Sequence, residues 1–341
     1  MKVGDEFVAS IMQNYGLEVY GSILLSDKNK KATWQLHTSQ GNKILKKVPG
    51  TEDRVRFIAE ATFYLQEAGV NVPRLEKTKT GELVAAHNGS YYVVMDWIGG
   101  SKPDLGNVAE TCSVLQALGQ FHRDSRGFKT AIDNGTRSHL GDWPRSMQRY
   151  NERLRDFLAK ARQRSDRFSE LFSEQAGHFI ARGEETLQRL ADSAYHDWVK
   201  RVERDGNLCH QDFAPRNLRI QADGTVAVFD MDSVTFDLPA RDLRKVFNKL
   251  GKKTKSWDVK IIQKLLSCYQ RTNPLSRAEW EVVFLDLWYP HLFYGVISKF
   301  YEGRAPDWSE EKFIKKLQEI VRVERDKEPV LRDLFARGAE G

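Results

Sequence analysis

The sequence predicts an α+β protein with a small antiparallel β-lobe, containing one inserted helix, followed by a larger and mostly helical lobe. Short segments that alternate apolar and polar residues crowd into the N-terminal third, together with an amphipathic helix at 52–68. Beyond residue 100, apolar residues recur at helical spacing, with one strand-rich stretch at 208–229. We therefore expect a β-rich lobe at 1–95, a connection at 96–100 and a helical lobe at 101–341.

Each element of the N-terminal lobe has its own signal. A helical stripe over 3–15 precedes the first strand, and Gly41-Asn42 and His87-Asn88-Gly89 are typical hairpin turns. The helix at 52–68 follows Pro49-Gly50 and ends before Gly69. Strands are expected at 20–25, 32–37, 43–48, 82–86 and 91–95. Helices are expected at 108–122, across 145–205 and across 241–337.

Composition excludes several classes of protein. Of 341 residues, 40% are hydrophobic and 29% are charged, which is typical of a globular chain and excludes wholesale disorder. The 53 Lys and Arg against 47 Asp and Glu leave a net charge of +6, far from the clustered charge of a dedicated nucleic-acid binder. The N-terminus lacks a signal-peptide core, and no stretch is apolar enough to cross a membrane. We expect a soluble, intracellular protein with neither nucleic acid nor membrane as a partner.

The cysteines point to the same compartment. Cys112, Cys209 and Cys268 lie far apart in the sequence and form no C-x-x-C pair. We expect neither a disulfide framework nor a structural zinc site, and a reducing environment fits best.

The stretch that indicates chemistry is 208–232. His210, Asp212 and Asn217 lie in one turn-rich loop, and Asp230 follows at the end of a predicted hairpin. Phosphoryl transfer from ATP needs these residue types: a carboxylate that orients and deprotonates the acceptor hydroxyl, and an amide oxygen and a second carboxylate that hold Mg²⁺. Asp232 is a further candidate metal ligand, although it could instead bond the backbone of its own turn.

A lysine on a separate strand would bind the phosphates of ATP. In the third predicted strand, alternation places Lys46 on one face with Ile44, and that face would line an apolar adenine slot. Lys47 would point to the other face, and it is the alternative if the register is shifted by one residue. Glu60, on the following helix, is the expected anionic partner of Lys46; the alternative is an ordinary solvated helix residue.

The pattern His210-x-Asp212-x₄-Asn217 with Asp230 resembles the motif and metal aspartate of the aminoglycoside phosphotransferase/choline kinase-like superfamily, which has a bilobal protein-kinase-like fold. Further stretches resemble the CotS family of spore-coat kinase-like proteins from endospore-forming bacteria, and the resemblance runs from about residue 20 to about residue 300. These stretches are Leu140-Gly141-Asp142-Trp143-Pro144, 207–212, 230–245 and Tyr289-Pro290-His291.

The resemblance implies a role for each catalytic residue. Asp212 would be the catalytic base, and His210 would brace its loop. Asn217 and Asp230 would be ligands of magnesium.

The resemblance also implies how the nucleotide is held. Lys46, paired with Glu60, would clamp the phosphates. The segment that contains Met95, Asp96 and Trp97 would be a hinge whose backbone meets adenine.

The sequence departs from the family pattern in its glycines. The loop at 26–31 contains none, so the glycine-rich phosphate cover of protein kinases is absent. Glycines often found at the positions of Gln211 and Arg216 are also missing, which bears on substrate access.

Motif and resemblance together predict an ATP- and Mg²⁺-dependent phosphotransferase. A small molecule or saccharide is the expected acceptor, because nothing after Asp230 resembles the peptide-docking segment of a protein kinase. The implied setting is the mother-cell cytoplasm and then the spore coat, with other coat proteins as candidate partners. Two alternatives remain: a catalytically weak or inactive kinase-like scaffold protein of the coat, and an antibiotic-modifying kinase.

Overall fold

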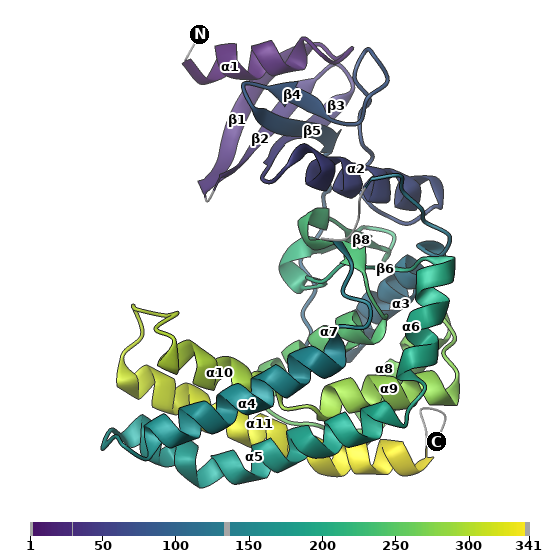
Figure 1. Cartoon of the computed structure of the whole chain (residues 1–341). Helices are drawn as coiled ribbons and strands as arrows, with labels where there is room; N and C mark the ends of the chain where they lie inside the picture. Colours follow the sequence, from purple (N-terminus) through teal and green to yellow (C-terminus); the bar gives the residue numbers. More distant parts are fainter. Residues whose placement is uncertain (1–2, 29, 133–136, 338–341) are drawn as a thin grey trace. The chain divides into compact units, whose positions relative to one another are not determined.

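The computed structural model describes residues 3–28, 30–132 and 137–337, and the chain forms two compact units (Figure 1). Unit 1 comprises 1–103, 120–138 and 205–236, and unit 2 comprises 104–119, 139–204 and 237–341. The two units are interleaved in the sequence. The strand-rich stretch that the sequence assigns to the helical lobe therefore packs in the same unit as the N-terminal strands.

Unit 1 is built on a five-stranded antiparallel sheet with strand order β1-β2-β3-β5-β4. The hairpin turn between its last two strands has left-handed backbone at Asn88 (φ 47°) and Gly89 (φ 67°), as that dipeptide predicts. The strand predicted at 82–86 is shorter in the structure, because Glu82 takes part in a turn: its carbonyl accepts the Thr78 N–H and its N–H donates to the Thr78 hydroxyl. The strands are β1 (Val19–Lys28), β2 (Lys31–Thr38), β3 (Gly41–Val48), β4 (Ala85–His87) and β5 (Ser90–Asp96).

Two helices cover opposite sides of this sheet (Figure 1). Helix α1 (Val3–Met12) packs through Ile11 and Met12 onto the face that carries Leu45. Helix α2 (Glu52–Glu67) begins at Thr51, whose hydroxyl accepts a hydrogen bond from the backbone of its first turn. Successive side chains of β3 point to opposite faces of the sheet, so Leu45 faces the core under α1, whereas Ile44 and Lys46 face the other side.

Short elements complete unit 1. Strand β6 (Leu208–Cys209) pairs with β9 (Thr235–Phe236), and β7 (Leu218–Ile220) pairs with β8 (Val226–Val228). Two 3₁₀ turns, η2 (Pro215–Asn217) and η3 (Met231–Ser233), lie at the ends of the second pair. The motif residues lie in two loops, 210–217 between β6 and β7 and 229–234 between β8 and β9, and these short strands hold both ends of each loop.

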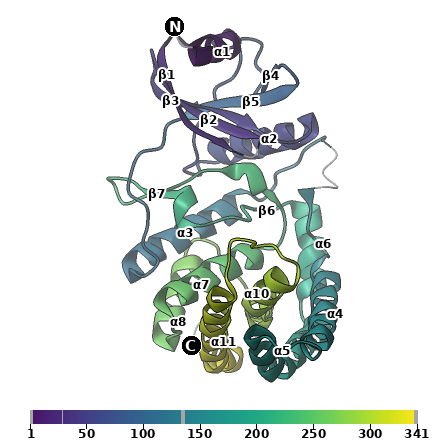
Figure 2. The ribbon, with the colours of Figure 1, turned by 90° about the vertical axis from the view of Figure 1, so that its left-hand side faces the viewer.

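The rest of the chain is helical. Four helices of unit 2, α4, α5, α10 and α11, pack side by side (Figure 2). None of the described helices has the length and hydropathy needed to cross a membrane. The helices beyond residue 100 are α3 (Val108–Asp124), α4 (Trp143–Ala161), α5 (Arg167–Ala191), α6 (Tyr195–Asp205), α7 (Ala240–Thr254), α8 (Val259–Gln270), α9 (Arg277–Trp288), α10 (His291–Tyr301) and α11 (Glu310–Arg337).

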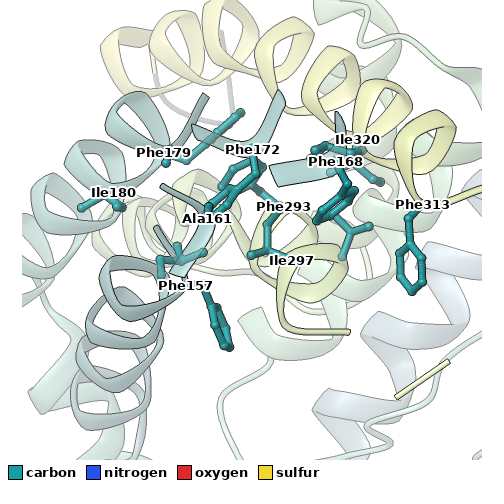
Figure 3. Packing of buried hydrophobic residues seen from close by; sticks show 14 residues of the cluster. Phe157, Ala161, Phe168, Phe172, Phe179, Ile180, Phe293, Ile297, Phe313 and Ile320 are labelled. Atoms are coloured by element: carbon teal, nitrogen blue, oxygen red, sulfur yellow. The ribbon is translucent and has the colours of Figure 1, made fainter. Parts of the chain in front are cut away.

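Aromatic side chains fill the space between these four helices (Figure 3). Phe157 comes from α4, Phe168 and Phe172 from α5, Phe293 from α10 and Phe313 from α11, and all five are buried. Large rings bury much apolar area with few rotatable bonds, so this cluster contributes strongly to the stability of unit 2.

The structure corrects the prediction about cysteines. Cys112 on α3 and Cys268 on α8 form a disulfide with a Cα–Cα distance of 5.4 Å, although 156 residues separate them. The prediction of no disulfide was wrong because distance along the chain does not limit contact between packed helices. Cys209, the third cysteine, is buried in β6.

Candidate active site

Unit 1 contains a cavity of about 750 Å³. Its wall combines the β1–β2 hairpin, the site face of β3, the segment after β5 and the loop after β8. A volume of this size suits a nucleotide-sized ligand. The lining residues are Leu25, Ser26, Lys28, Lys31, Thr33, Ile44, Lys46, Pro73, Met95, Asp96, Trp97, Ile98, Gly99, Gly100, Arg219, Phe229 and Asp230.

Lys46 projects into this cavity from β3. Ile44 and Lys46 line the wall, whereas Leu45 between them is fully buried against α1 on the opposite face. The ammonium nitrogen Nζ of Lys46 lies 2.6 Å from Asp230 Oδ1 and 2.6 Å from Asp232 Oδ1. Burial opposes the charged form, but the two carboxylates hold the pKa of Lys46 above its ordinary value.

The two aspartates differ in exposure. The side chain of Asp232 is 10% exposed and is bound by two lysines, because Lys31 Nζ also lies 2.7 Å from its Oδ2. Burial works against its ionisation, yet Lys46 and Lys31 lower the pKa of Asp232. Asp230 is 37% exposed, lines the cavity and has left-handed backbone (φ 61°). Such strained backbone is typical of functional sites.

His210 connects the catalytic loop to the hairpin that precedes Asp230. Its Nδ1 accepts the Asp212 N–H at 3.2 Å, so Nε2 carries the proton and donates it to the Phe229 carbonyl at 3.0 Å. The fully buried imidazole thus links the backbone of Asp212 to the backbone of Phe229, the residue just before Asp230. Its contacts are those of a positioning residue.

Asn217 and Arg216, in the same loop, both contact the side chain of Asp212. Asn217 Nδ2 donates to Asp212 Oδ2 at 2.9 Å and to the Asp212 carbonyl at 3.0 Å, and the Arg216 guanidinium pairs with Oδ2. Because the amide nitrogen of Asn217 is directed at Asp212, the amide oxygen is the atom that a cation could use.

The backbone of this loop explains why glycine is often found at the position of Gln211. Gln211 has φ 65°, a left-handed conformation in which a residue with a Cβ is strained and glycine is not. The chain keeps this conformation without glycine.

Glu60 requires a correction. It lies on α2, and its Oε2 accepts a hydrogen bond from the Thr130 hydroxyl at 2.6 Å. The structure therefore does not pair it with Lys46, whose charge is balanced by Asp230 and Asp232.

Met95, Asp96 and Trp97 all line the cavity. The N–H of Asp96 donates to the Arg74 carbonyl at 3.0 Å, and the N–H of Trp97 donates to the Asn42 carbonyl at 3.2 Å. Both bonds fix the segment as an extension of the sheet.

Sequence reasoning missed Lys43, which holds this segment. Its Nζ lies 2.6 Å from the Asp96 carboxylate and also pairs with Glu76, and its side chain is only 7% exposed. Burial disfavours its charge, but the Asp96 and Glu76 carboxylates keep its pKa raised. The available signal was its place on the Leu45 face of β3, where a lysine needs a partner.

A second polar network lies in unit 2. Trp143 Nε1 donates to Asp237 Oδ1 at 3.1 Å, and Asp286 is bound by Arg244 and His291, both at 2.8 Å. Burial and the Arg244 charge lower the pKa of His291 to about 4. Four of these residues come from the stretches that resemble CotS proteins, and they stabilise the contacts between helices of unit 2.

A protein family described as "Spore coat putative kinase YutH" matches residues 9–334. The chain is also 31% identical over 328 residues to spore coat protein S of Bacillus subtilis (strain 168), a match that covers 96% of this chain and 93% of that protein. This chain belongs to the spore-coat kinase family.

Solved structures of aminoglycoside phosphotransferases share the fold of this chain. The crystal structure of an aminoglycoside phosphotransferase from Alicyclobacillus acidocaldarius aligns with a TM-score of 0.82 at 17% identity, covering 96% of this chain and 95% of that one. Spectinomycin phosphotransferase APH(9)-Ia, in complex with ADP and spectinomycin, aligns with a TM-score of 0.59 at 14% identity, covering 98% of both chains. The predicted α+β protein-kinase-like fold is confirmed: a five-stranded antiparallel sheet with a helix, and a helical remainder.

Proposed function

We propose that this spore-coat kinase-family protein binds ATP and Mg²⁺ in the cavity of unit 1 and transfers the γ-phosphate to a hydroxyl group of a small molecule or saccharide. The observation that supports this most strongly is one polar constellation. Lys46 meets Asp230 and Asp232 at the cavity, and His210 links the Asp212 loop to the residue before Asp230.

Adenine would bind at the apolar end of the cavity. Ile44, Met95 and Trp97 supply apolar surface there. Because the N–H groups of Asp96 and Trp97 are already bonded within the sheet, we infer that the Asp96 carbonyl and the Ile98 N–H contact the adenine edge. Lys46 would then bind the α- and β-phosphates.

The residues present suit magnesium. Asp230 offers a partly exposed carboxylate and Asn217 an amide oxygen, and hard oxygen ligands are those that Mg²⁺ prefers. Asp232 is a candidate third ligand, but its two lysine partners make it the less available carboxylate. When bound, Mg²⁺ would neutralise charge on the phosphates.

Asp212 would orient the acceptor and take the proton of its hydroxyl as the oxygen attacks the γ-phosphorus. The bond from that phosphorus to the β,γ-bridging oxygen breaks, and ADP leaves. Asn217, which donates to Asp212 Oδ2, would fix the carboxylate in position. The setting we propose is the mother-cell cytoplasm followed by the spore coat, with other coat proteins as partners.

The experiment that tests this function is phosphotransfer from ATP to a panel of sugars, amino alcohols and aminoglycosides. Asp212→Asn keeps the volume of the side chain but cannot act as a base, so we expect turnover to fall about 10²–10⁴-fold while ADP affinity stays near that of the wild type. Asp223→Asn, the same change in the exposed turn between β7 and β8, is the matched control. Equal turnover in wild type and Asp212→Asn would refute the assignment of the base.

One observation favours a second candidate, a catalytically weak or inactive scaffold protein of the coat. The Asp212 carboxylate is bound by Arg216 and Asn217, which compete with an incoming hydroxyl. The same panel separates the candidates: a scaffold would bind ADP yet phosphorylate nothing, whereas an antibiotic-modifying kinase would act on the aminoglycosides.

A further inference from the structure

The tip of the β1–β2 hairpin carries lysines where many kinases carry glycines. Lys28 ends β1 and Lys31 begins β2, and the two are paired across the hairpin. Both side chains line the cavity that also contains Lys46 and Asp230. Three ammonium groups from two neighbouring hairpins therefore border the same cavity.

Asp232 holds two of these lysines. Its Oδ2 lies 2.7 Å from Lys31 Nζ and its Oδ1 lies 2.6 Å from Lys46 Nζ. An ammonium group has three donor hydrogens, and Lys31 uses one of them here. Since the Lys31 side chain is 45% exposed and lines the cavity, its other hydrogens remain available to a ligand.

We propose that Lys28 and Lys31 bind the phosphate chain of the nucleotide, in place of the backbone N–H groups of a glycine-rich loop. This inference rests on the proposed function, because it assumes that a nucleotide occupies the cavity. Glycine lets a backbone approach phosphates closely, and a hairpin without glycine cannot use that route. Long cationic side chains reach phosphate oxygens instead and form charge-assisted hydrogen bonds with them.

Asp232 then acts as a positioning residue. By bonding Lys31 and Lys46 at once, it brings together ammonium groups that would otherwise repel each other. Phosphate recognition of this kind depends on charge more than on backbone geometry, so it weakens as salt screens the partly exposed lysines.

The test is calorimetric titration of the full chain with adenosine, AMP and ADP. For the double variant Lys28→Gln/Lys31→Gln we expect ADP to bind about 10- to 50-fold more weakly, because two partly exposed charge-assisted contacts are lost. Adenosine should bind within about twofold of the wild type, because it lacks phosphates. Lys30→Gln is the matched control, because Lys30 is exposed and lies in the same hairpin but outside the cavity lining.

Four outcomes would overturn the inference. In the double variant, these are an unchanged affinity for ADP and an equal loss of affinity for adenosine. In the single variants, they are an equal loss of ADP affinity in Lys30→Gln and a large loss of ADP affinity in Lys31→Arg, which keeps the charge. If the double variant does not fold, Lys28→Gln alone repeats the test with the Lys31–Asp232 pair intact. A wild type that binds none of the three ligands would refute the proposed function itself and this inference with it.

Discussion

Replacing Lys46 by Met removes an ammonium group that two carboxylates share. Breaking a buried ion pair typically costs about 3–5 kcal/mol. Here Asp232 keeps its second lysine and Asp230 is 37% exposed, so we expect a loss of about 1–2 kcal/mol in the free energy of unfolding. The lost phosphate contact, a charge-assisted hydrogen bond, should weaken ADP binding by about 1.5–3 kcal/mol, which is roughly 10- to 150-fold.

The matched control is Lys47→Met, one residue further along β3. Lys47 shares the Leu45 face, away from the cavity, so this substitution should change ADP affinity by less than about twofold. Its side chain is only partly buried, so stability should change by less than about 0.5 kcal/mol. Urea unfolding gives the first quantity and calorimetric titration gives the second. A larger effect at Lys47 than at Lys46 would refute the assignment of the two faces. An equal loss of adenosine binding in Lys46→Met would show that this lysine shapes the cavity without binding phosphate.

Three further predictions concern other parts of the chain. Cys112→Ser should lower the free energy of unfolding by about 2–4 kcal/mol under oxidising conditions and by much less with reductant, because the disulfide to Cys268 closes a long loop in the unfolded chain. Equal melting temperatures of wild type and variant under oxidising conditions would contradict this. The pKa of His291 is lowered to about 4, so as the pH falls below about 6.5 this histidine is protonated in the unfolded chain before it is protonated in the folded protein. The free energy of unfolding should therefore be highest above about pH 6.5 and fall by roughly 2–3 kcal/mol toward pH 4. His291→Gln should reduce this loss. Glu60→Gln should leave ADP affinity within about twofold, and a tenfold loss would restore its predicted role beside Lys46.

Local patterns account for what the sequence could predict. Period-two alternation assigned Ile44 and Lys46 to one face of β3, and the structure places both at the cavity. The Asn88-Gly89 turn and the start of α2 followed equally from short-range rules. Such features depend on a few neighbouring residues and on backbone sterics.

Partners distant in the sequence were not predictable in this way. The sequence predicted Glu60 as the partner of Lys46, but Lys46 is bound by Asp230 and Asp232, which lie about 185 residues away in the chain. The contact between Lys43 and Asp96 depends on the pairing of β3 with β5, which strand patterns alone do not specify. The roles of the motif residues in binding and catalysis stay predictions until they are measured.

The measurement that tests the central claim most directly is the thermal shift produced by ADP with and without Mg²⁺, on wild type and on Asp230→Asn. Asp230 lines the cavity, and its loss leaves Lys46 paired with Asp232, so the variant should fold. At a hundredfold excess over Kd, ligand binding stabilises a protein by about 2.7 kcal/mol. We predict that ADP raises the melting temperature of both proteins and that Mg²⁺ adds a further increase only in the wild type. A full magnesium-dependent increase in Asp230→Asn, or no shift with ADP in the wild type, would contradict the account.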